Sequence, residues 1–274
     1  MITKFISRII PDKLYLQIVY RRNMGKFLNL KNPITFQEKL QWLKLYNRKS
    51  IYTTMVDKYE AKKYVANIIG GKYVIPTLGI WEKAECIDFG KLPDKFVLKT
   101  THDSGGVIVC CNKSQLNIEE VIKNLNNRLH NNVFYTTREW PYKNVKPRII
   151  AEEYIEMPNA TEMVDYKIYC FSGMPMYIQV IQDRMTNETI DFFNLKWEHQ
   201  DFTGLQQKSK KSKKIINKPL NLDEMIKIAA KLSKNIPFVR IDLYNISGRI
   251  YFGEITFFPL SGLGNFTPTS WNIK

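Results

Sequence analysis

The sequence has no apolar run long enough to cross a membrane, few cysteines and only 3 histidines. A transmembrane helix needs about 18 or more consecutive apolar residues, so none is expected. The N-terminus, MITKFISRIIPDK, has neither the apolar core nor the small-residue cleavage site of a secretory signal. The 4 cysteines and the histidines follow no metal-binding spacing. We therefore expect a cytoplasmic protein with reduced thiols.

Familiar nucleotide-site and sugar-transfer motifs are also missing. No phosphate loop of the G-x-x-x-x-G-K-[ST] type occurs. Asp88-Phe89-Gly90 matches a kinase tripeptide, but neither a His-Arg-Asp loop nor a G-x-G-x-x-G loop accompanies it. The Asp-x-Asp motif of many metal-dependent glycosyltransferases is absent, as is any recognised nucleic-acid-binding motif. These absences argue against a P-loop enzyme, a protein kinase and a nucleic-acid-binding protein.

Positive charge is what the chain has in excess. Its 41 Lys and Arg against 26 Asp and Glu give a net charge of +15. This balance suits an anionic partner, whether a nucleotide, an acidic sugar, a membrane surface or nucleic acid, without choosing among them. Residues 1–33 combine basic with aromatic side chains; docking on the body of the protein is favoured, and contact with a membrane surface is the alternative. The lysine-rich segment 208–218 is expected to be a solvated loop, with a lid or polymer-binding loop as the alternative.

The 274 residues, 44% of them hydrophobic, suffice for a large core. Thr35 and Glu38 form a capping-box pattern that begins a helix ending near Arg48. Periodicity and turn residues predict the other elements. Helices are expected at 57–69, 118–130 and 223–235, strands at 78–81, 93–99, 107–111, 148–155, 164–171, 174–182 and 189–197, and an irregular segment at 131–147.

The segment Thr100–Gly106 joins two predicted strands and is rich in hydroxyl groups and glycine. Backbone N–H groups of such a loop can contact phosphate oxygens, and Lys99 at the end of the strand would supply a cation. A plain hairpin turn is the other interpretation, and it is the commoner one for a Ser-Gly-Gly sequence.

The stretch FVRIDLYNISGRIYFGEITFFPLSG (238–262) predicts a hairpin with strands 239–245 and 249–257 joined by a short loop. The expected register pairs Asn245 with Arg249. Because side chains alternate along a strand, each face then has its own set of residues. One face carries Arg240, Asp242, Glu254 and Thr256, and the other carries Val239, Ile241, Leu243, Tyr251, Ile255 and Phe257.

Asp242 and Glu254 would be diagonal neighbours on the polar face. Two close carboxylates repel unless a proton, an arginine or a cation lies between them, and Mg²⁺ commonly takes one or two carboxylates plus substrate phosphates. The hairpin therefore predicts a metal–phosphate site with Arg240 as an anion contact. A half-exposed hairpin with an Arg240–Glu254 ion pair fits the pattern equally well. A slip of one residue in register would move the two carboxylates to opposite faces.

The order of these motifs resembles the ATP-grasp superfamily, and more closely its TupA-like branch, which is named for teichuronopeptide synthesis. The similarity covers most of the chain between 32 and 264, in NPITFQEKLQWLK (32–44), DKYEAKKYV (57–65), FVLKTTHDSGG (96–106), AEEYI (151–155), DYKIYCFSG (165–173) and VRIDLYNISGRIYFGEITFFPLSG (239–262). It implies an α+β ATP-grasp fold in which two α+β subdomains hold ATP between antiparallel sheets. The implied division is an N-terminal helical segment, 1–56, and an ATP-grasp domain, 57–274, with a nucleotide-binding part, 57–150, and a metal and substrate part, 151–274.

The resemblance also implies roles for individual residues. ATP would be bound by Lys58, Lys99, Ser104, Gly105, Gly106, Glu152, Glu153 and Ile155. Mg²⁺ would be bound by Asp242, Glu254 and Thr256, and the catalytic residues would be Arg240 and Lys167. Thr256 departs from the superfamily pattern, which usually has Asn two residues after the metal-binding Glu, although the TupA-like branch carries Thr there.

By resemblance, the protein would be an ATP-dependent carboxylate–amine ligase of surface polysaccharide biosynthesis, as in capsule or O-antigen synthesis. An acylphosphate would form, and an amine would attack it. The expected partners are ATP, Mg²⁺, an acidic sugar or polysaccharide precursor and an amine donor, in the cytoplasm or at the inner face of the membrane; nucleic acid is not expected. Rival functions are a glycosyltransferase, a sugar kinase and a non-catalytic protein that binds an anionic polymer.

Overall fold

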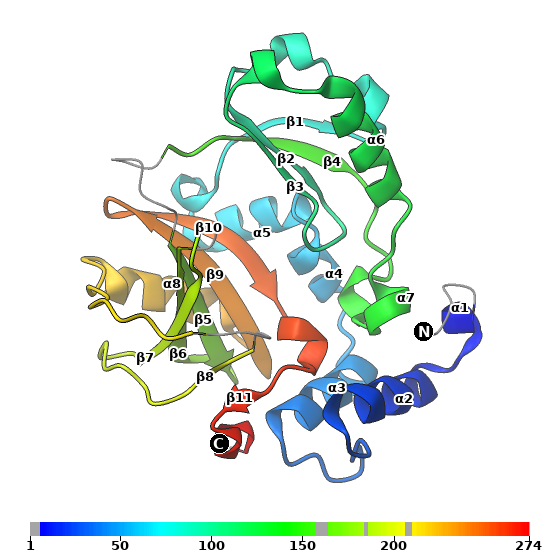
Figure 1. Cartoon of the computed structure of the whole chain (residues 1–274), viewed down its shortest axis with the longest axis vertical. Helices are drawn as coiled ribbons and strands as arrows, with labels where there is room; N and C mark the ends of the chain where they lie inside the picture. Colours follow the sequence, from blue (N-terminus) through cyan, green and yellow to red (C-terminus); the bar gives the residue numbers. More distant parts are fainter. Residues whose placement is uncertain (1–5, 157–163, 184–185, 206–209, 274) are drawn as a thin grey trace.

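Two antiparallel sheets form the body of the protein (Figure 1). The structure, a computed structural model, describes residues 6–156, 164–183, 186–205 and 210–273. The four-stranded sheet has the order β1-β4-β2-β3, with β1 (Thr77–Trp81), β2 (Phe96–Thr100), β3 (Val107–Cys110) and β4 (Ile149–Glu153). The five-stranded sheet has the order β10-β9-β5-β6-β7, with β5 (Asp165–Phe171), β6 (Met174–Gln182), β7 (Thr189–Asn194), β9 (Phe238–Ile246) and β10 (Arg249–Thr256). A separate short pair is formed by β8 (Thr203–Gly204) and β11 (Phe266–Thr267).

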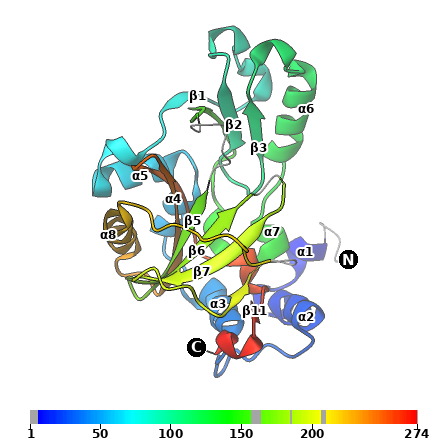
Figure 2. The ribbon, with the colours of Figure 1, turned by 60° about the vertical axis from the view of Figure 1, so that its left-hand side comes forward.

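Helices pack against the sheets and at one end of the molecule. They are α1 (Ile6–Ile9), α2 (Asp12–Met24), α3 (Phe36–Tyr46), α4 (Ile51–Val56), α5 (Glu60–Ile69), α6 (Ile118–Leu129), α7 (Phe134–Thr137) and α8 (Leu222–Ser233). Helix α6 packs on the four-stranded sheet, while α8 packs on the five-stranded sheet. In both views, α2 and α3 lie at the end of the molecule away from the four-stranded sheet (Figure 2).

Each sheet has one face in a hydrophobic core. Phe96 and Leu98 of the four-stranded sheet pack with Val121 and Leu125, whose helical spacing in the sequence predicted the buried side of α6. Ile168, with its neighbours on the five-stranded sheet, packs in a larger cluster that also contains apolar residues of α3, α4, α5 and α8. Each large apolar side chain buried in this way contributes about 1.5 to 3 kcal/mol. The polar residues that alternate with these apolar residues along the strands lie on the other face of each sheet.

The β9–β10 hairpin forms with a different register from the one predicted. Ile246 pairs with Arg249 across a two-residue turn, Ser247-Gly248, in which φ is positive at both positions, 50° and 84°. Such turns match the twist of the flanking strands. Continued without interruption, this register would oppose Asp242 to Gly253. The register instead shifts between Phe252 and Glu254, so Glu254 pairs directly with Asp242.

Because of this bulge at Gly253, the residues of β10 after it lie on the predicted face of the hairpin, while the residues before it lie on the opposite face. Asp242, Glu254, Arg240 and Thr256 lie on one face, as predicted. Tyr251 does not lie with the apolar set assigned to it, because it precedes the bulge. It packs instead with Ile75 and Ile246 in a separate cluster.

Other predicted elements are confirmed with small changes. The capping box of Thr35 and Glu38 begins α3. The helix expected at 57–69 begins only at Glu60, so Lys58 lies in the turn between α4 and α5 and not within a helix. The segment expected to be irregular contains α7 and a short 3-10 helix, Trp140–Tyr142. Of the lysine-rich segment, 208 and 209 lie outside the described residues, and 210–218 form neither helix nor strand and have no buried residue.

The N-terminal helices dock on the body, as favoured by the sequence. Leu16 and Tyr20 of α2 are buried with Leu28 against partly buried residues that include Leu45. Arg138, which follows α7, is also buried, and its guanidinium donates to backbone oxygens of the N-terminal segment and pairs with Asp12. Across the described ranges, no helix has both the length and the apolar character needed to span a bilayer.

Candidate functional site

A cleft of about 970 Å³ is lined by residues of both sheets. All the sequence-predicted site residues except Gly106 line it. They come from the turn before α5, from β2 and its following loop, from β4, and from β5, β9 and β10. The residues that the resemblance predicted are up to about two hundred positions apart in the chain, and they lie in one cleft.

Arg240 lies between the two carboxylates of the β9–β10 hairpin. Its Nε and Nη2 donate to Oδ1 and Oδ2 of Asp242 at 2.6 and 2.7 Å. The same Nη2 donates to Oε1 of Glu254 and to Oγ1 of Thr256, each at 3.1 Å. Lys167, the direct neighbour of Asp242 on β5, forms a second ion pair with Oδ2 of Asp242. The Arg240–Glu254 ion pair expected under the alternative interpretation is thus present, within a larger cluster of charges.

The two carboxylates differ in exposure. The side chain of Asp242 is 4% exposed, whereas that of Glu254 is 44% exposed. Burial raises the pKa of Asp242, but the charges of Arg240 and Lys167 outweigh it and hold this pKa below its usual range. Burial opposes the charged form of Arg240, yet the Asp242 carboxylate raises the pKa of Arg240 above its usual value. Both groups are therefore charged at neutral pH.

This hairpin has a donor set that fits Mg²⁺. Asp242 and Glu254 supply carboxylate oxygens on one face, and Thr256 supplies a hydroxyl that donates to Oε1 of Glu254 at 2.8 Å. Among the described residues there is no cluster of three or more His, Cys, Asp or Glu that could hold a metal by themselves. Mg²⁺ usually takes only one or two protein carboxylates and completes its coordination with water and substrate phosphates. Asp242 and Glu254 are two carboxylates of this kind.

Facing this hairpin, Glu152 lies between two lysines. Its Oε1 is 2.5 Å from Nζ of Lys62, and its Oε2 pairs with Lys99. Burial raises the pKa of Glu152, but the two ammonium groups outweigh it and lower this pKa overall. Lys62 also donates to the backbone oxygen of Ile75 at 2.6 Å. Sequence reasoning did not single out Lys62, although it follows Lys58 by about one helical turn.

The loop after β2 is held by side chains of the loop and of two other segments. Lys58 donates to the backbone oxygens of Thr100, at 3.0 Å, and of Asp103. The buried carboxylate of Asp103 accepts from the Thr100 hydroxyl and, at 2.9 Å, from Nη1 of Arg128. A Cβ at Gly106 would lie only 2.2 Å from Oγ1 of Thr100, so this position requires glycine. Gly106 thus shapes the loop, while Ser104 and Gly105 line the cleft.

Two buried charged side chains that the sequence did not reveal, Lys44 and Glu139, interact electrostatically, and Glu139 lines the cleft. Nζ of Lys44 donates to the backbone oxygens of Thr137 and Ser261 at 2.8 Å each. Burial lowers the pKa of Lys44 to about 8, although the carboxylate of Glu139 opposes this shift. Burial likewise raises the pKa of Glu139, which lines the cleft. Neither residue has a local pattern that would identify it, because charged residues in a helix and a loop are normally solvated.

The turn that accepts from Lys44 has an unusual backbone. Leu260, Ser261 and Gly262 have φ values of 47°, 54° and 64°, and the first two are not glycine. Non-glycine residues in this region are uncommon, and they cost about 1 to 3 kcal/mol each unless surrounding contacts hold them. Gln41 provides such contacts, with Nε2 donating to the backbone oxygens of Ser261 and Gly262 at 3.0 and 2.8 Å. Strain of this kind is concentrated at functional sites.

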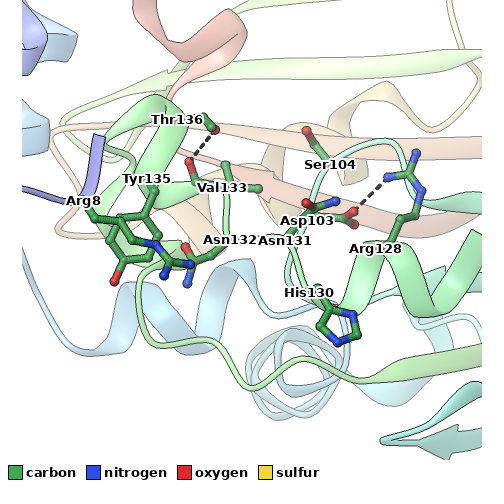
Figure 3. A pocket seen from close by; sticks show the side chains of 10 residues that line it. All are labelled: Arg8, Asp103, Ser104, Arg128, His130, Asn131, Asn132, Val133, Tyr135 and Thr136. Carbon is green, nitrogen blue, oxygen red and sulfur yellow. Dashed lines mark hydrogen bonds and ion pairs between the residues drawn. The ribbon is translucent and has the colours of Figure 1, made fainter. Parts of the chain in front are cut away.

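A second, smaller cavity of about 230 Å³ adjoins the loop after β2 (Figure 3). Asp103 and Ser104 line it on one side, and Arg8 and Tyr135 line it on another. The guanidinium of Arg8 lies over the Tyr135 ring, 5.1 Å from its centroid. Most of its lining residues are polar, and they include two guanidinium groups, those of Arg8 and Arg128, beside a single carboxylate. Since Ser104 lines both cavities, a ligand in the smaller cavity would lie next to the loop that borders the larger one.

Comparisons with known proteins agree with the resemblance seen in the sequence. A family model described as TupA-like ATPgrasp matches residues 38–273. Among solved structures, the chain is similar to D-alanine–D-alanine ligase from Bacillus anthracis complexed with ATP, with 20% identity, 76% of this chain and 54% of that chain covered, and a TM-score of 0.41. For D-alanine–D-alanine ligase from Helicobacter pylori the values are 16%, 83%, 63% and 0.42. For the ATP-grasp ligase PsnB complexed with minimal precursor, Mg and ADP they are 10%, 81%, 57% and 0.40.

The chain therefore spans between 54% and 63% of the length of these three ligases. No protein with a curated description matches the sequence at a significant level.

Proposed function

Because the chain belongs to the TupA-like ATP-grasp family, we propose that it is an ATP-dependent carboxylate–amine ligase. Its α+β fold with antiparallel sheets is ATP-grasp-like, as the sequence led us to expect. The single observation that supports the proposal most is the cleft in which Lys58 and Lys99 line one side and Asp242 and Glu254 line the other. A nucleoside triphosphate with Mg²⁺ requires cations for its phosphates and carboxylates for the metal, both facing the same space.

In this proposal, the ATP phosphates bind between the lysines and the loop residues Ser104, Gly105 and Gly106. Lys58 and Lys99 neutralise phosphate charge, and the backbone N–H groups of the loop contact phosphate oxygens. The adenine binds at the other end of the cleft, near Glu153 and Ile155. That end also contains Ile75, Val97 and Phe252, whose apolar side chains suit a purine ring.

The proposed reaction has two steps. A carboxylate oxygen of the acid attacks the γ-phosphorus, and ADP leaves with the electron pair of the broken P–O bond. The amine nitrogen then attacks the acyl carbon, and phosphate leaves as the amide forms and the amine gives up its proton. Mg²⁺ bound by Asp242, Glu254 and Thr256 would neutralise charge on the transferring phosphoryl group.

Arg240 and Lys167 would stabilise the negative charge on the phosphoryl group that Mg²⁺ does not neutralise. Arg240 and Lys167 are already fixed by Asp242, so they present donors toward the cleft without reorganisation during the reaction. Glu254 is the more exposed carboxylate and so the more accessible to a metal that enters with the nucleotide. The acylphosphate must be protected from water, which closure of the two sheets over the ligand would achieve.

For the acid we propose an acidic sugar or polysaccharide precursor, bound in the smaller cavity. Its guanidinium groups suit a carboxylate, and its amide and hydroxyl side chains suit sugar hydroxyls. The amine donor would be an amino acid or another amine, and the reaction would take place in the cytoplasm. We propose surface polysaccharide synthesis as the setting because the TupA-like branch is named for teichuronopeptide synthesis.

The test is incubation of the protein with ATP, Mg²⁺ and pairs of uronic acids and amino acids, followed by measurement of ADP and of product mass. A ligase releases ADP only when both acid and amine are present, and its product weighs one water less than the two together. ADP release with a neutral sugar alone would favour a sugar kinase. Sugar transfer in the absence of ATP would favour a glycosyltransferase.

A further inference from the structure

The outward side of α2 is apolar where a surface helix is normally polar. Its buried side consists of Tyr15, Leu16 and Tyr20. With 3.6 residues per turn, Leu14 and Ile18 lie on the opposite side, one turn apart, and Arg21 follows on the same stripe. The exposed fractions of Leu14 and Ile18 are 52% and 42%. The helix is therefore apolar on two sides, and only one of them is covered by the fold.

Further exposed apolar side chains lie in the adjoining segments. Ile9, at the end of α1, is 69% exposed, and Phe27, after α2, is 74% exposed. The guanidinium of Arg21 lies over the Phe27 ring at 4.4 Å from its centroid. Scattered exposed apolar residues need no explanation, but a group of them within a single short segment indicates an interaction surface.

Basic residues are frequent in the same stretch of the chain. Between 6 and 33 they are Arg8, Lys13, Arg21, Arg22, Lys26 and Lys31. The only acidic residue in that range is Asp12. Its carboxylate pairs with Arg48 and Arg138, at 2.7 and 2.9 Å, so it is neutralised from inside the fold. The outer side of α2 thus combines apolar side chains with positive charge that has little local opposition.

We propose that this surface, defined by Ile9, Leu14, Ile18, Arg21, Arg22 and Phe27, binds the anionic surface of a lipid membrane. Helices that lie in the membrane interface combine apolar side chains with Lys and Arg in this way. The apolar side chains enter the headgroup region while the arginines contact lipid phosphates. The charge favours anionic lipid over an apolar protein partner or a second copy of this chain, because two copies would bring like charges together.

This surface is fixed to the rest of the protein. Arg138 joins α1 and α2 to the segment after α7, and its chain neighbour Glu139 lines the cleft. Both views show α2 at one end of the molecule, away from the four-stranded sheet (Figures 1 and 2). Membrane binding through α2 would therefore leave that sheet away from the membrane. The inference is independent of the ligase activity proposed above.

The test is flotation of the full chain with vesicles of phosphatidylcholine alone or mixed with phosphatidylglycerol. We expect binding to the anionic vesicles, weakening as salt is raised, and little binding to neutral ones. Arg21→Gln/Arg22→Gln should weaken binding about fivefold for each arginine replaced. Leu14→Ser/Ile18→Ser should weaken it at least tenfold. Circular dichroism of each variant would show that the fold is retained.

Two control variants carry matched changes elsewhere. Met174→Ser/Met176→Ser removes exposed apolar side chains of β6, and Lys210→Gln/Lys213→Gln removes exposed charges of the lysine-rich segment. Neither should change vesicle binding appreciably. No binding to anionic vesicles, or equal losses in the α2 and control variants, would overturn the proposal. So would a dimer in light scattering that Leu14→Ser/Ile18→Ser converts to a monomer, because the surface would then serve self-association.

Discussion

Glu254 lies directly opposite Asp242 only because Gly253 bulges from β10. The tight turn at Ser247-Gly248 sets a register in which Gly253 would oppose Asp242 and Glu254 would point to the other face. The extra residue in β10 moves the side chains of the residues after it to the opposite face of the hairpin. Bulges are frequently found beside active sites, where they redirect a side chain. Here the bulge is what places the two carboxylates on one face of the hairpin.

The first prediction concerns the bulge. A Cβ at Gly253 would lie 3.1 Å from the backbone oxygen of Asp242 and 3.3 Å from Cε2 of Tyr244. Gly253→Val should therefore lower the free energy of unfolding by about 1 to 3 kcal/mol, measured by urea denaturation. It should also lower Mg²⁺-dependent turnover more than this loss explains. Gly71→Ala, where nothing lies within 4 Å of the added Cβ, is the matched control.

The second prediction concerns the metal. Glu254→Gln keeps the shape of the side chain but removes a carboxylate charge, so turnover with ATP and Mg²⁺ should fall at least a hundredfold. Thermal unfolding should change little, because this side chain is not part of the core. Glu82→Gln, which alters an exposed ion pair with Lys146, should leave both measurements unchanged. Normal turnover in Glu254→Gln would exclude this carboxylate as a metal ligand.

A third prediction concerns nucleotide binding. Lys99→Ala removes a cation from the cleft and should weaken ATP binding at least tenfold, measured by isothermal titration calorimetry. The same substitution leaves Glu152 paired with Lys62. Lys95→Ala, in an exposed pair with Glu156 outside the cleft, is the control. Equal ATP affinity in Lys99→Ala and the unaltered protein would contradict the assigned role.

The pH dependence of stability provides a fourth prediction. The folded-state pKa of Glu152 lies below the unfolded value of 4.5, so the carboxylate stabilises the fold above pH 4.5 and this contribution is lost as pH falls through the folded pKa. Glu152→Gln should be less stable than the unaltered protein by about 3 kcal/mol at neutral pH. Urea denaturation at successively lower pH should show the difference shrinking below pH 4.5. A difference that is constant with pH would mean that the charge of Glu152 is not its cause.

The electrostatic interaction between the buried side chains of Lys44 and Glu139 provides the fifth prediction. Removing one partner of a buried pair leaves an uncompensated charge, so Lys44→Met should cost about 3 to 5 kcal/mol of unfolding free energy. Lys44→Met/Glu139→Gln should cost clearly less than the sum of the single changes. The exposed pair of Lys95 and Glu156 should show a coupling energy below about 1 kcal/mol in the same double-mutant cycle. Additive costs at Lys44 and Glu139 would show that the two side chains do not interact.

Local patterns predicted the elements that depend on neighbours in sequence. The capping box of Thr35 and Glu38 began a helix as expected, and Ser172-Gly173 joined β5 to β6. The strand expected at 164–171 is β5, Asp165–Phe171. These features need only a few residues to specify them, so one sequence is enough to find them.

Features that depend on distant contacts could not be predicted in the same way. The register of the β9–β10 hairpin depends on whether a turn takes two or three residues, which Ile246-Ser247-Gly248 leaves open. The pairing of Lys44 with Glu139 joins segments far apart in the chain. Neither charge stands out from the many solvated lysines and glutamates around it. Such groups become candidates only when their burial is known.

Arg138 also has a practical consequence. Its guanidinium finds three of its acceptors in the first turns of the chain, at Ser7, Ile10 and Asp12. A recombinant version shortened to begin at the family match, residue 38, would lose these three acceptors and keep only those of Phe134 and Tyr135, beside the wall that carries Glu139. Loss of function in such a shortened protein would report damage to the wall of the cleft, and the complete N-terminus belongs in any crystallisation or activity study.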